Sequence, residues 1–166
     1  HEALRTRFVS LEGEVLQQVD EPAIGFALVR HDLRADANAQ ARLGELAHQE
    51  ASQPFDLQHG PLVRGRLIRL HEHEHVLLVT MHHIVSDGWS MGVVIRELSE
   101  LYAAFSQGRD DPLQPLQVQY ADYAAWQRSW LQEQVLQQQL AHWQGTLAAA
   151  PALLELPTDA PRPATQ

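Results

Sequence analysis

Two adjacent histidines followed by an Asp-Gly pair are the residues of this sequence best suited to chemistry. His82 and His83 precede Asp87 and Gly88, a spacing that reads His-His-x-x-x-Asp-Gly. A neutral imidazole has a reference pKa of about 6.5, so at neutral pH it is mostly unprotonated and can accept a proton. The pattern therefore predicts an acid-base site, and His83 is our choice for the reacting group because it lies nearer the loop.

The remaining residues of the motif predict support for that imidazole. We expect His82 to brace the loop through hydrogen bonds. Two roles are open for Asp87: it caps the following helix, or it pairs with an arginine and fixes the shape of the loop. Gly88 permits backbone that a Cβ would block, and its N–H can donate to a developing oxyanion. A plainer interpretation is that the histidines are hydrogen-bonded core residues and that Asp87 is only an N-cap. The histidine pair, the Asp-Gly and the strand-loop-helix setting occur together here, and this favours a functional site.

The sequence on either side places the motif between a strand and a helix. Apolar residues predict strands at 62–70 and 75–82, with a hairpin turn at 71–74. In a regular strand the two histidines point to opposite faces, so one can face a cleft while the other is packed. Apolar residues at helical spacing from Met91 to Phe105, followed by Gly108, predict the helix after the loop. The N–H groups of its first turn are expected to point at the same space as the imidazole.

Other segments complete an α/β domain. Strand-forming residues or turn signals predict further strands at 7–9, 15–19 and 24–29. Apolar periodicity predicts helices at 39–51, capped by Asp36 or Asn38, then at 120–130 and 135–147. We expect a mainly antiparallel or mixed sheet packed with helices. The arginines of the strand regions are interpreted as solvated charges: Arg30, Arg34, Arg64, Arg66 and Arg69.

Composition excludes several classes of protein. The chain has 166 residues, 45% of them hydrophobic, which is enough to bury a core. A formal net charge of −9 argues against nucleic-acid binding. The sequence has no cysteine, which excludes disulfides and is compatible with the cytoplasm, where we place the protein. No apolar run approaches the length of a membrane span. Three histidines, at 71, 73 and 75, fall at a predicted turn, and we assign no metal site to them.

The motif resembles that of condensation domains of nonribosomal peptide synthetases, which belong to the chloramphenicol-acetyltransferase-like acyltransferases. The similarity covers essentially the whole chain, through the stretches His1–Phe8, Pro54–Leu57, Gly60–Leu62, Gln119–Gln127 and Leu156–Pro163. It implies a chloramphenicol-acetyltransferase-like two-layer sandwich, of which this chain supplies the N-terminal lobe. We therefore expect a partial condensation domain at 1–155, without its first strand and helix, and a proline-rich linker at 156–166 toward a missing second lobe.

The resemblance also implies a reaction. An aminoacyl group on one carrier protein attacks the thioester of an acyl or peptidyl group on another, and a peptide bond forms. By resemblance, His83 is the catalytic histidine, Gly88 a backbone contributor, and His82 and Asp87 structural residues of the loop. Trp89 and Ser90 are candidates for the substrate tunnel. The partner of Asp87 is expected to be Arg5 or an arginine that precedes His1 in the family.

The resemblance implies partners rather than a bound cofactor. The phosphopantetheine arm comes from carrier proteins, and an adenylation domain and the second lobe are the expected neighbours. The string Ser86–Ser90 resembles domains that take an L-configured donor. We expect this piece alone to be inactive and to expose apolar surface and a sheet edge. Two rival functions are an acyltransferase that uses an alcohol or amine acceptor and a degenerate docking scaffold.

Overall fold

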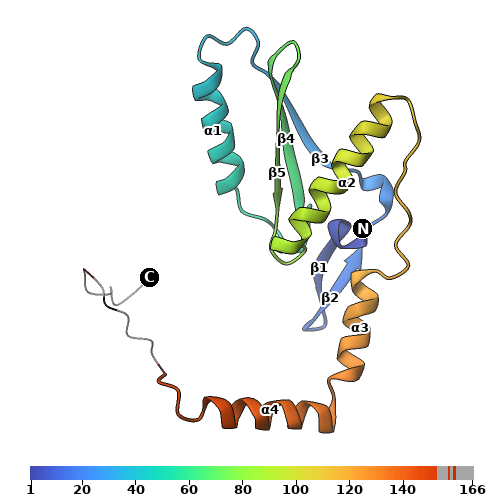
Figure 1. Cartoon of the computed structure of the whole chain (residues 1–166), viewed down its shortest axis with the longest axis vertical. Coiled ribbons are helices and arrows are strands. Elements are labelled where there is room, and N and C mark those ends of the chain that lie inside the picture. The colour runs from blue at the N-terminus through green and yellow to red at the C-terminus, as the bar shows by residue number, and fades with distance from the viewer. Residues whose placement is uncertain (153–156, 158, 160–166) are drawn as a thin grey trace. The chain divides into compact units, whose positions relative to one another are not determined.

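The computed structural model of the chain describes residues 1–152, Pro157 and Asp159. The chain divides into two compact units, His1–Ala124 and Ala125–Gln166, and the motif belongs to the first (Figure 1). The linker expected at 156–166 lies outside the described residues apart from Pro157 and Asp159, and so does the expected boundary between 155 and 156.

A short 3-10 helix and a hairpin open the first unit. Helix η1 (Glu2–Arg5) leads into β1 (Thr6–Leu11), which pairs with β2 (Glu14–Val19) in an antiparallel ladder. The turn between the strands has positive φ angles at Glu12 (52°) and Gly13 (86°), the backbone form that matches the twist of a hairpin. Both strands confirm the sequence prediction, and β1 is longer than predicted.

The main sheet of the first unit has three strands in the order β3-β4-β5. Strand β3 (Ala27–Asp32) is parallel to β4 (Val63–His71), which is antiparallel to β5 (Glu74–Met81). The mixed sheet and the turn between β4 and β5 are as predicted. Strand β3 begins later than predicted because Pro22–Ile24 forms a 3-10 helix, η2, and Gly25 has a φ of 71°.

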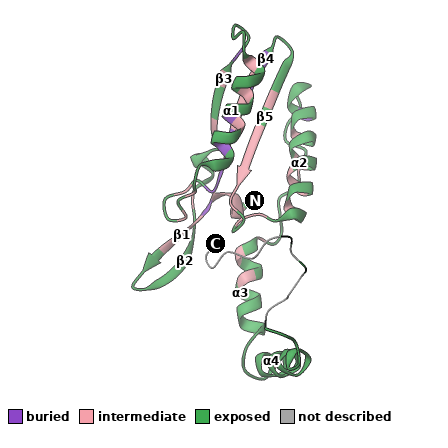
Figure 2. Cartoon of the chain, turned by 90° about the vertical axis from the view of Figure 1, so that its left-hand side faces the viewer, coloured by how far each residue is buried: buried purple, intermediate pink, exposed green. Residues whose placement is uncertain are grey.

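Helix α1 (Ala39–Ser52) connects the two parallel strands and covers one face of the sheet (Figure 1). Its N-cap is Asn38, one of the two residues predicted. The buried core between helix and sheet consists of Leu33, Leu46, Ile68 and Leu70, with Val76 and Leu78 packed against it. Figure 2 shows the buried residues gathered where α1 meets the strands.

The same face of β4 carries two arginines, which the sequence suggested were solvated charges. That interpretation was wrong. Arg64 and Arg66 lie on the same face of β4 as the core residues Ile68 and Leu70, because every second residue of a strand shares a face. They therefore point toward α1. There they meet Glu50, whose residue is only 4% exposed, at 2.6 Å and 2.7 Å. Burial raises the pKa of Glu50, but the hydrogen bonds from Arg66 and Arg64 outweigh it and hold the pKa below its ordinary value.

The opposite face of β4 has a close approach at Gly65. A Cβ at this position would lie 2.6 Å from the carbonyl oxygen of Leu78 and 2.7 Å from the ring of Phe26. Both distances are below van der Waals contact, and one of them involves backbone that cannot move aside. Only glycine therefore allows the ring to lie against the strand here.

Three further helices follow the sheet. They are α2 (Gly88–Ser106), α3 (Tyr120–Trp130) and α4 (Glu133–Leu147). Helix α2 is followed by Gly108 with a φ of 67°, as its sequence predicted. Helix α3 begins in the first unit and continues into the second, which also contains α4. None of the helices in the described part of the chain is long and apolar enough to cross a membrane.

Much apolar surface of α2 is open within the described residues. Trp89 is 86% exposed, Ile95 61%, Tyr102 76% and Phe105 58%. The outer strands of the main sheet, β3 and β5, have no further strand beside them in the described part of the chain. The resemblance predicts both features for a chain whose packing partner is elsewhere.

Candidate active site

The loop between β5 and α2 begins on the sheet ladder. Strand β5 ends at Met81, one residue before the predicted end, yet the His82 amide still donates to the carbonyl of Leu62 at 2.9 Å. His82 is therefore anchored to the chain that enters β4. His83 is the first residue of the turn that follows.

His82 is the centre of the hydrogen bonds within the loop. Its carbonyl accepts from the Val85 amide and from the Ser86 hydroxyl, both at 3.1 Å. Its ring Nδ1 accepts from the Ile84 amide at 3.0 Å. The ring also meets Phe55 edge to face, with the ring centres 5.5 Å apart. These contacts tie three residues of the loop to one histidine.

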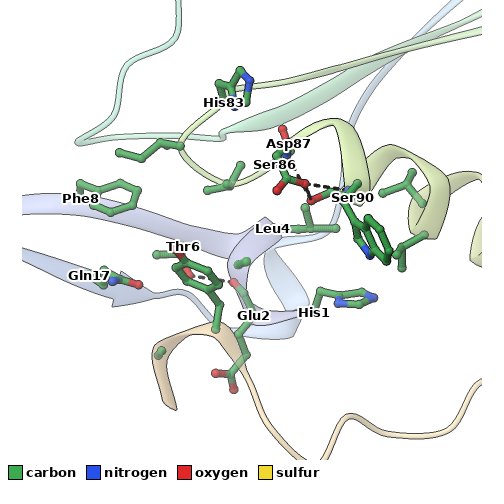
Figure 3. A pocket seen from close by; sticks show the side chains of 18 residues that line it. His1, Glu2, Leu4, Thr6, Phe8, Gln17, His83, Ser86, Asp87 and Ser90 are labelled. Carbon is green, nitrogen blue, oxygen red and sulfur yellow. Dashed lines mark hydrogen bonds between the residues drawn. The ribbon is translucent and has the colours of Figure 1, made fainter. Parts of the chain in front are cut away.

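His83 faces open space. His83 is exposed and is one of the residues around a cavity of about 500 Å³ bounded by η1, the first two strands, the loop, the first turns of α2 and the start of α3. In Figure 3 its ring lies on the side of the loop away from Leu4, Thr6 and Phe8, which line the cavity from below. Thr6 and Phe8 contribute to the wall from β1. His83 also borders a second, shallower depression, together with Met81, Gly88 and Met91. His82 is not among the residues that line either space, so the two histidines have different surroundings.

Asp87 caps α2. Its Oδ1 accepts from the Ser90 amide at 2.8 Å and from the Ser90 hydroxyl at 2.6 Å, while its own amide donates to the Ser90 Oγ at 3.2 Å. This is a reciprocal capping box. The hydrogen bonds from the side chain and the backbone of Ser90 hold the pKa of Asp87 below its ordinary value. Of the two roles open for Asp87, the structure shows the cap.

Arg5, one of the two arginines expected as a partner of Asp87, has other partners in this structure. Its guanidinium donates to the backbone carbonyl of Asp20 and, at 3.3 Å, to the carboxylate of Glu2. Asp20 also binds Arg7 through its carboxylate, at 2.9 Å. Arg5 therefore joins η1 to the end of β2, and an Arg5–Asp87 pair is not found among the ion pairs of the described residues.

Gly88 and the two tunnel candidates belong to the first turn of α2. Gly88 is the first residue of α2. Trp89 and Ser90 both line the cavity, Trp89 with most of its side chain exposed. His83 and the N-terminal turn of α2 thus border the same cavity, and the partial positive charge of that turn favours a developing negative charge.

Sequence reasoning missed the residues behind His82. Phe55 contacts the His82 ring and is not among the residues that line the cavity, and the Arg64 guanidinium carbon lies 3.9 Å from the centre of the Phe55 ring. The sequence feature that could have pointed to Phe55 was the stretch Pro54–Leu57, which we interpreted only as a connector and as one of the stretches that resemble the family. Nothing in that stretch states that its aromatic residue meets the first histidine.

Comparisons with known proteins identify the relatives of this chain. The family model described as Condensation domain matches residues 1–166. Malpibaldin synthetase of Mortierella alpina is 52% identical over 166 residues, which are 100% of this chain and 3% of that protein. Phosphinothricin tripeptide synthetase of Streptomyces viridochromogenes is 42% identical over 167 residues, 99% of this chain and 15% of that protein. The chain thus spans only a small part of these relatives.

A solved structure shows the same fold. The crystal structure of the X-domain from teicoplanin biosynthesis matches with a TM-score of 0.81 and 35% identity, covering 99% of this chain and 36% of that one. The expected chloramphenicol-acetyltransferase-like α/β fold is confirmed by this likeness. With a family model that spans every residue and a motif that lines a cavity, the chain belongs to the condensation-domain family of nonribosomal peptide synthetases.

Proposed function

We propose that this chain is the motif-bearing part of a domain that joins two carrier-bound substrates through a peptide bond. The observation that carries the proposal is the position of His83, exposed on the cavity while His82 and Asp87 hold the two ends of its loop. The name of one relative, a tripeptide synthetase, supports the same chemistry. The carrier proteins that bring the substrates on phosphopantetheine arms are the expected partners.

The proposed step conserves atoms and charge. The α-amine of the acceptor attacks the thioester carbonyl of the donor, a C–N bond forms, and the C–S bond breaks. The donor arm leaves as a thiolate, and the proton lost by the amine passes to it. His83 either takes that proton as the tetrahedral intermediate forms or holds the amine in place. An α-amine titrates near 7.7–8.0, so part of the acceptor is already unprotonated at neutral pH.

The test uses the complete condensation domain with loaded donor and acceptor carriers, and it measures product by mass spectrometry. His83→Ala is expected to lower the rate about 10²- to 10⁴-fold, the usual contribution of a positioned base. His75→Ala is the matched control, because it removes an exposed histidine of β5 that lines neither space. His83→Gln separates the two roles, since a glutamine can orient an amine but cannot take its proton.

Other outcomes would contradict the proposal. A complete wild-type domain that makes no product points to a docking scaffold. A product with an alcohol acceptor, and none with the amine, points to a different acyltransferase. The proposed L-donor preference rests on the string Ser86–Ser90, and equal rates with L- and D-configured donors would refute it.

A further inference from the structure

A line of three side chains leads from the core to the motif loop. The Arg64 guanidinium carbon lies 3.9 Å from the centre of the Phe55 ring. The Phe55 ring then meets the His82 imidazole at 5.5 Å between ring centres, with 88° between the planes. Both geometries are attractive for their groups, a cation over an aromatic face and an edge-to-face pair of rings.

Arg64 is the fixed end of this line. Its side chain is 12% exposed and its Nε donates to the Glu50 carboxylate at 2.6 Å. Its two terminal nitrogens donate to the carbonyls of Glu50 (3.0 Å), Gln53 and Pro54 (3.2 Å), at and just beyond the end of α1. A guanidinium with this many partners has almost no freedom to move. The face that it presents to Phe55 is therefore set by the core.

His82 is the movable end. Because the Ile84 amide donates to Nδ1, that nitrogen carries no proton, and the neutral ring is the Nε2–H tautomer. If the imidazole turned about its χ2 angle, Nδ1 would leave the Ile84 amide and the loop would lose that contact. The Phe55 ring beside the imidazole opposes such a rotation. His83 follows His82 directly in the chain, so a change in the position of His82 would also displace the reacting imidazole.

We propose that Phe55, clamped by Arg64, is a positioning residue for the motif: it locks the His82 ring and so fixes the place of His83. The effect on turnover rests on the proposed function, whereas the effect on the His82 ring does not. Phe55 touches neither the cavity nor the reacting atoms, and it acts only through His82.

The test compares three variants of the complete condensation domain. Phe55→Leu removes the ring and keeps an apolar side chain, and Phe55→Tyr restores the ring. Phe26→Leu is the matched control, because Phe26 lies against the same strand at Gly65. The first readout is the imidazole nitrogen chemical shifts of His82 by NMR, which report its tautomer without any substrate. The second is kcat and KM for the acceptor carrier.

Phe55→Leu is expected to mix the two tautomers of His82 and to lower kcat at least about 10-fold with little change in KM, because misplacement of a reacting group by about 1 Å can cost 10²-fold. Phe55→Tyr and Phe26→Leu should keep the wild-type tautomer and kcat. An unchanged His82 signal in Phe55→Leu overturns the proposal, as does an equal loss in Phe26→Leu. If the wild-type domain forms no peptide bond, the proposed function fails, and the NMR readout still decides the role of Phe55.

Discussion

The side chains of the motif divide their work between chemistry and support. His83 is exposed on the cavity, while the hydrogen bonds of His82 and Asp87 turn back into the loop and α2. Asp87 and Ser90 satisfy each other reciprocally, so the first turn of α2 starts at a fixed residue. The orientation of the helix N-terminus toward the cavity therefore depends on one carboxylate and one hydroxyl.

At this scale we predict that Asp87→Asn is tolerated better than Asp87→Ala. Asparagine caps helices about as well as aspartate, whereas alanine has no acceptor for the Ser90 amide. Asp87→Ala should speed hydrogen exchange of the Trp89 and Ser90 amides and lower condensation activity, and Asp87→Asn should do so far less. Ser99→Ala, a change of a hydroxyl further along α2, serves as the control. Equal exchange in the two Asp87 variants would contradict the cap as the role of this residue.

The sequence predicted the residues of the motif better than their partners. The spacing of His82, His83 and Asp87 was enough to assign the brace, the exposed imidazole and a possible cap. The partners of Arg5 were not predictable, because a long guanidinium side chain can reach several acceptors. The one that it reaches, the Asp20 carbonyl, is placed by the hairpin of β1 and β2. Phe55 was missed for the same reason: its contact with His82 exists only in three dimensions.

At the scale of elements, helical periodicity predicted the four α-helices of the described chain, and strand-forming residues with turn signals predicted its strands. The errors came from backbone and burial. Strand β3 begins after the predicted start because Pro22 begins a 3-10 helix and Gly25 has a positive φ angle. These backbone preferences outweighed the strand preference of the apolar residues from Ile24 onward. On β4 the charge of Arg64 and Arg66 suggested solvent, but α1 covers that face and supplies Glu50. The sequence shows that these residues are charged, but whether a helix covers them depends on the packing of the elements.

We predict that Glu50→Gln destabilises the fold strongly. The change keeps the shape of the side chain but leaves two largely buried guanidinium groups without their carboxylate. Removing one member of a buried ion pair typically lowers the free energy of unfolding by about 3–5 kcal/mol. Urea denaturation would measure this loss. The matched control is Glu45→Gln, on the same helix, where the pair with Arg42 is exposed and little change is expected. A loss no larger than that of the control would contradict a structural role for the cluster.

Stability should also decrease as the pH falls, because of His31 on β3. Burial and then the charges of Arg66 and Arg42 hold the pKa of His31 below its ordinary 6.5, and its Nε2 has no hydrogen-bond partner in the described part of the chain. The unfolded chain therefore binds the proton first as pH falls. This contribution to stability is complete above about pH 6.5 and is lost as pH decreases toward the lower pKa.

The measurement is urea denaturation of wild type and His31→Gln between pH 8 and 5. The wild type should lose stability over this window, and the variant should show a flatter dependence because the titrating group is gone. The lowered pKa of Glu50 does not contribute in this window, because its effect on stability begins only below its ordinary pKa of 4.5. Identical slopes for the two proteins between pH 7 and 5 would refute the role of His31.

At the scale of the whole molecule, open surfaces dominate. The outer strands β3 and β5 and the apolar side chains of α2 lack cover within the described residues. The chain also covers only 36% of the solved relative whose fold it shares. We infer that the rest of a complete domain covers these surfaces and closes the space around His83.

We therefore predict that the isolated chain, given loaded carriers, forms no detectable peptide product. It should also bind a dye specific for apolar surface and associate with itself at micromolar concentration, because exposed edges and apolar faces promote both. The complete domain with the same residues is the control, and it should turn over and remain monomeric. Turnover by the isolated chain at a rate near that of the complete domain would rule out this need for the rest of the domain.

The close approach at Gly65 sets a limit on divergence within the family. A methyl group there would collide with the Leu78 carbonyl as well as with the Phe26 ring, so replacing Phe26 by a smaller residue would relieve only half of the conflict. A residue bulkier than glycine at this position would therefore require β4 and β5 to shift relative to each other. A natural homologue with alanine or valine at this site should therefore show a different pairing of the two strands in its crystal structure.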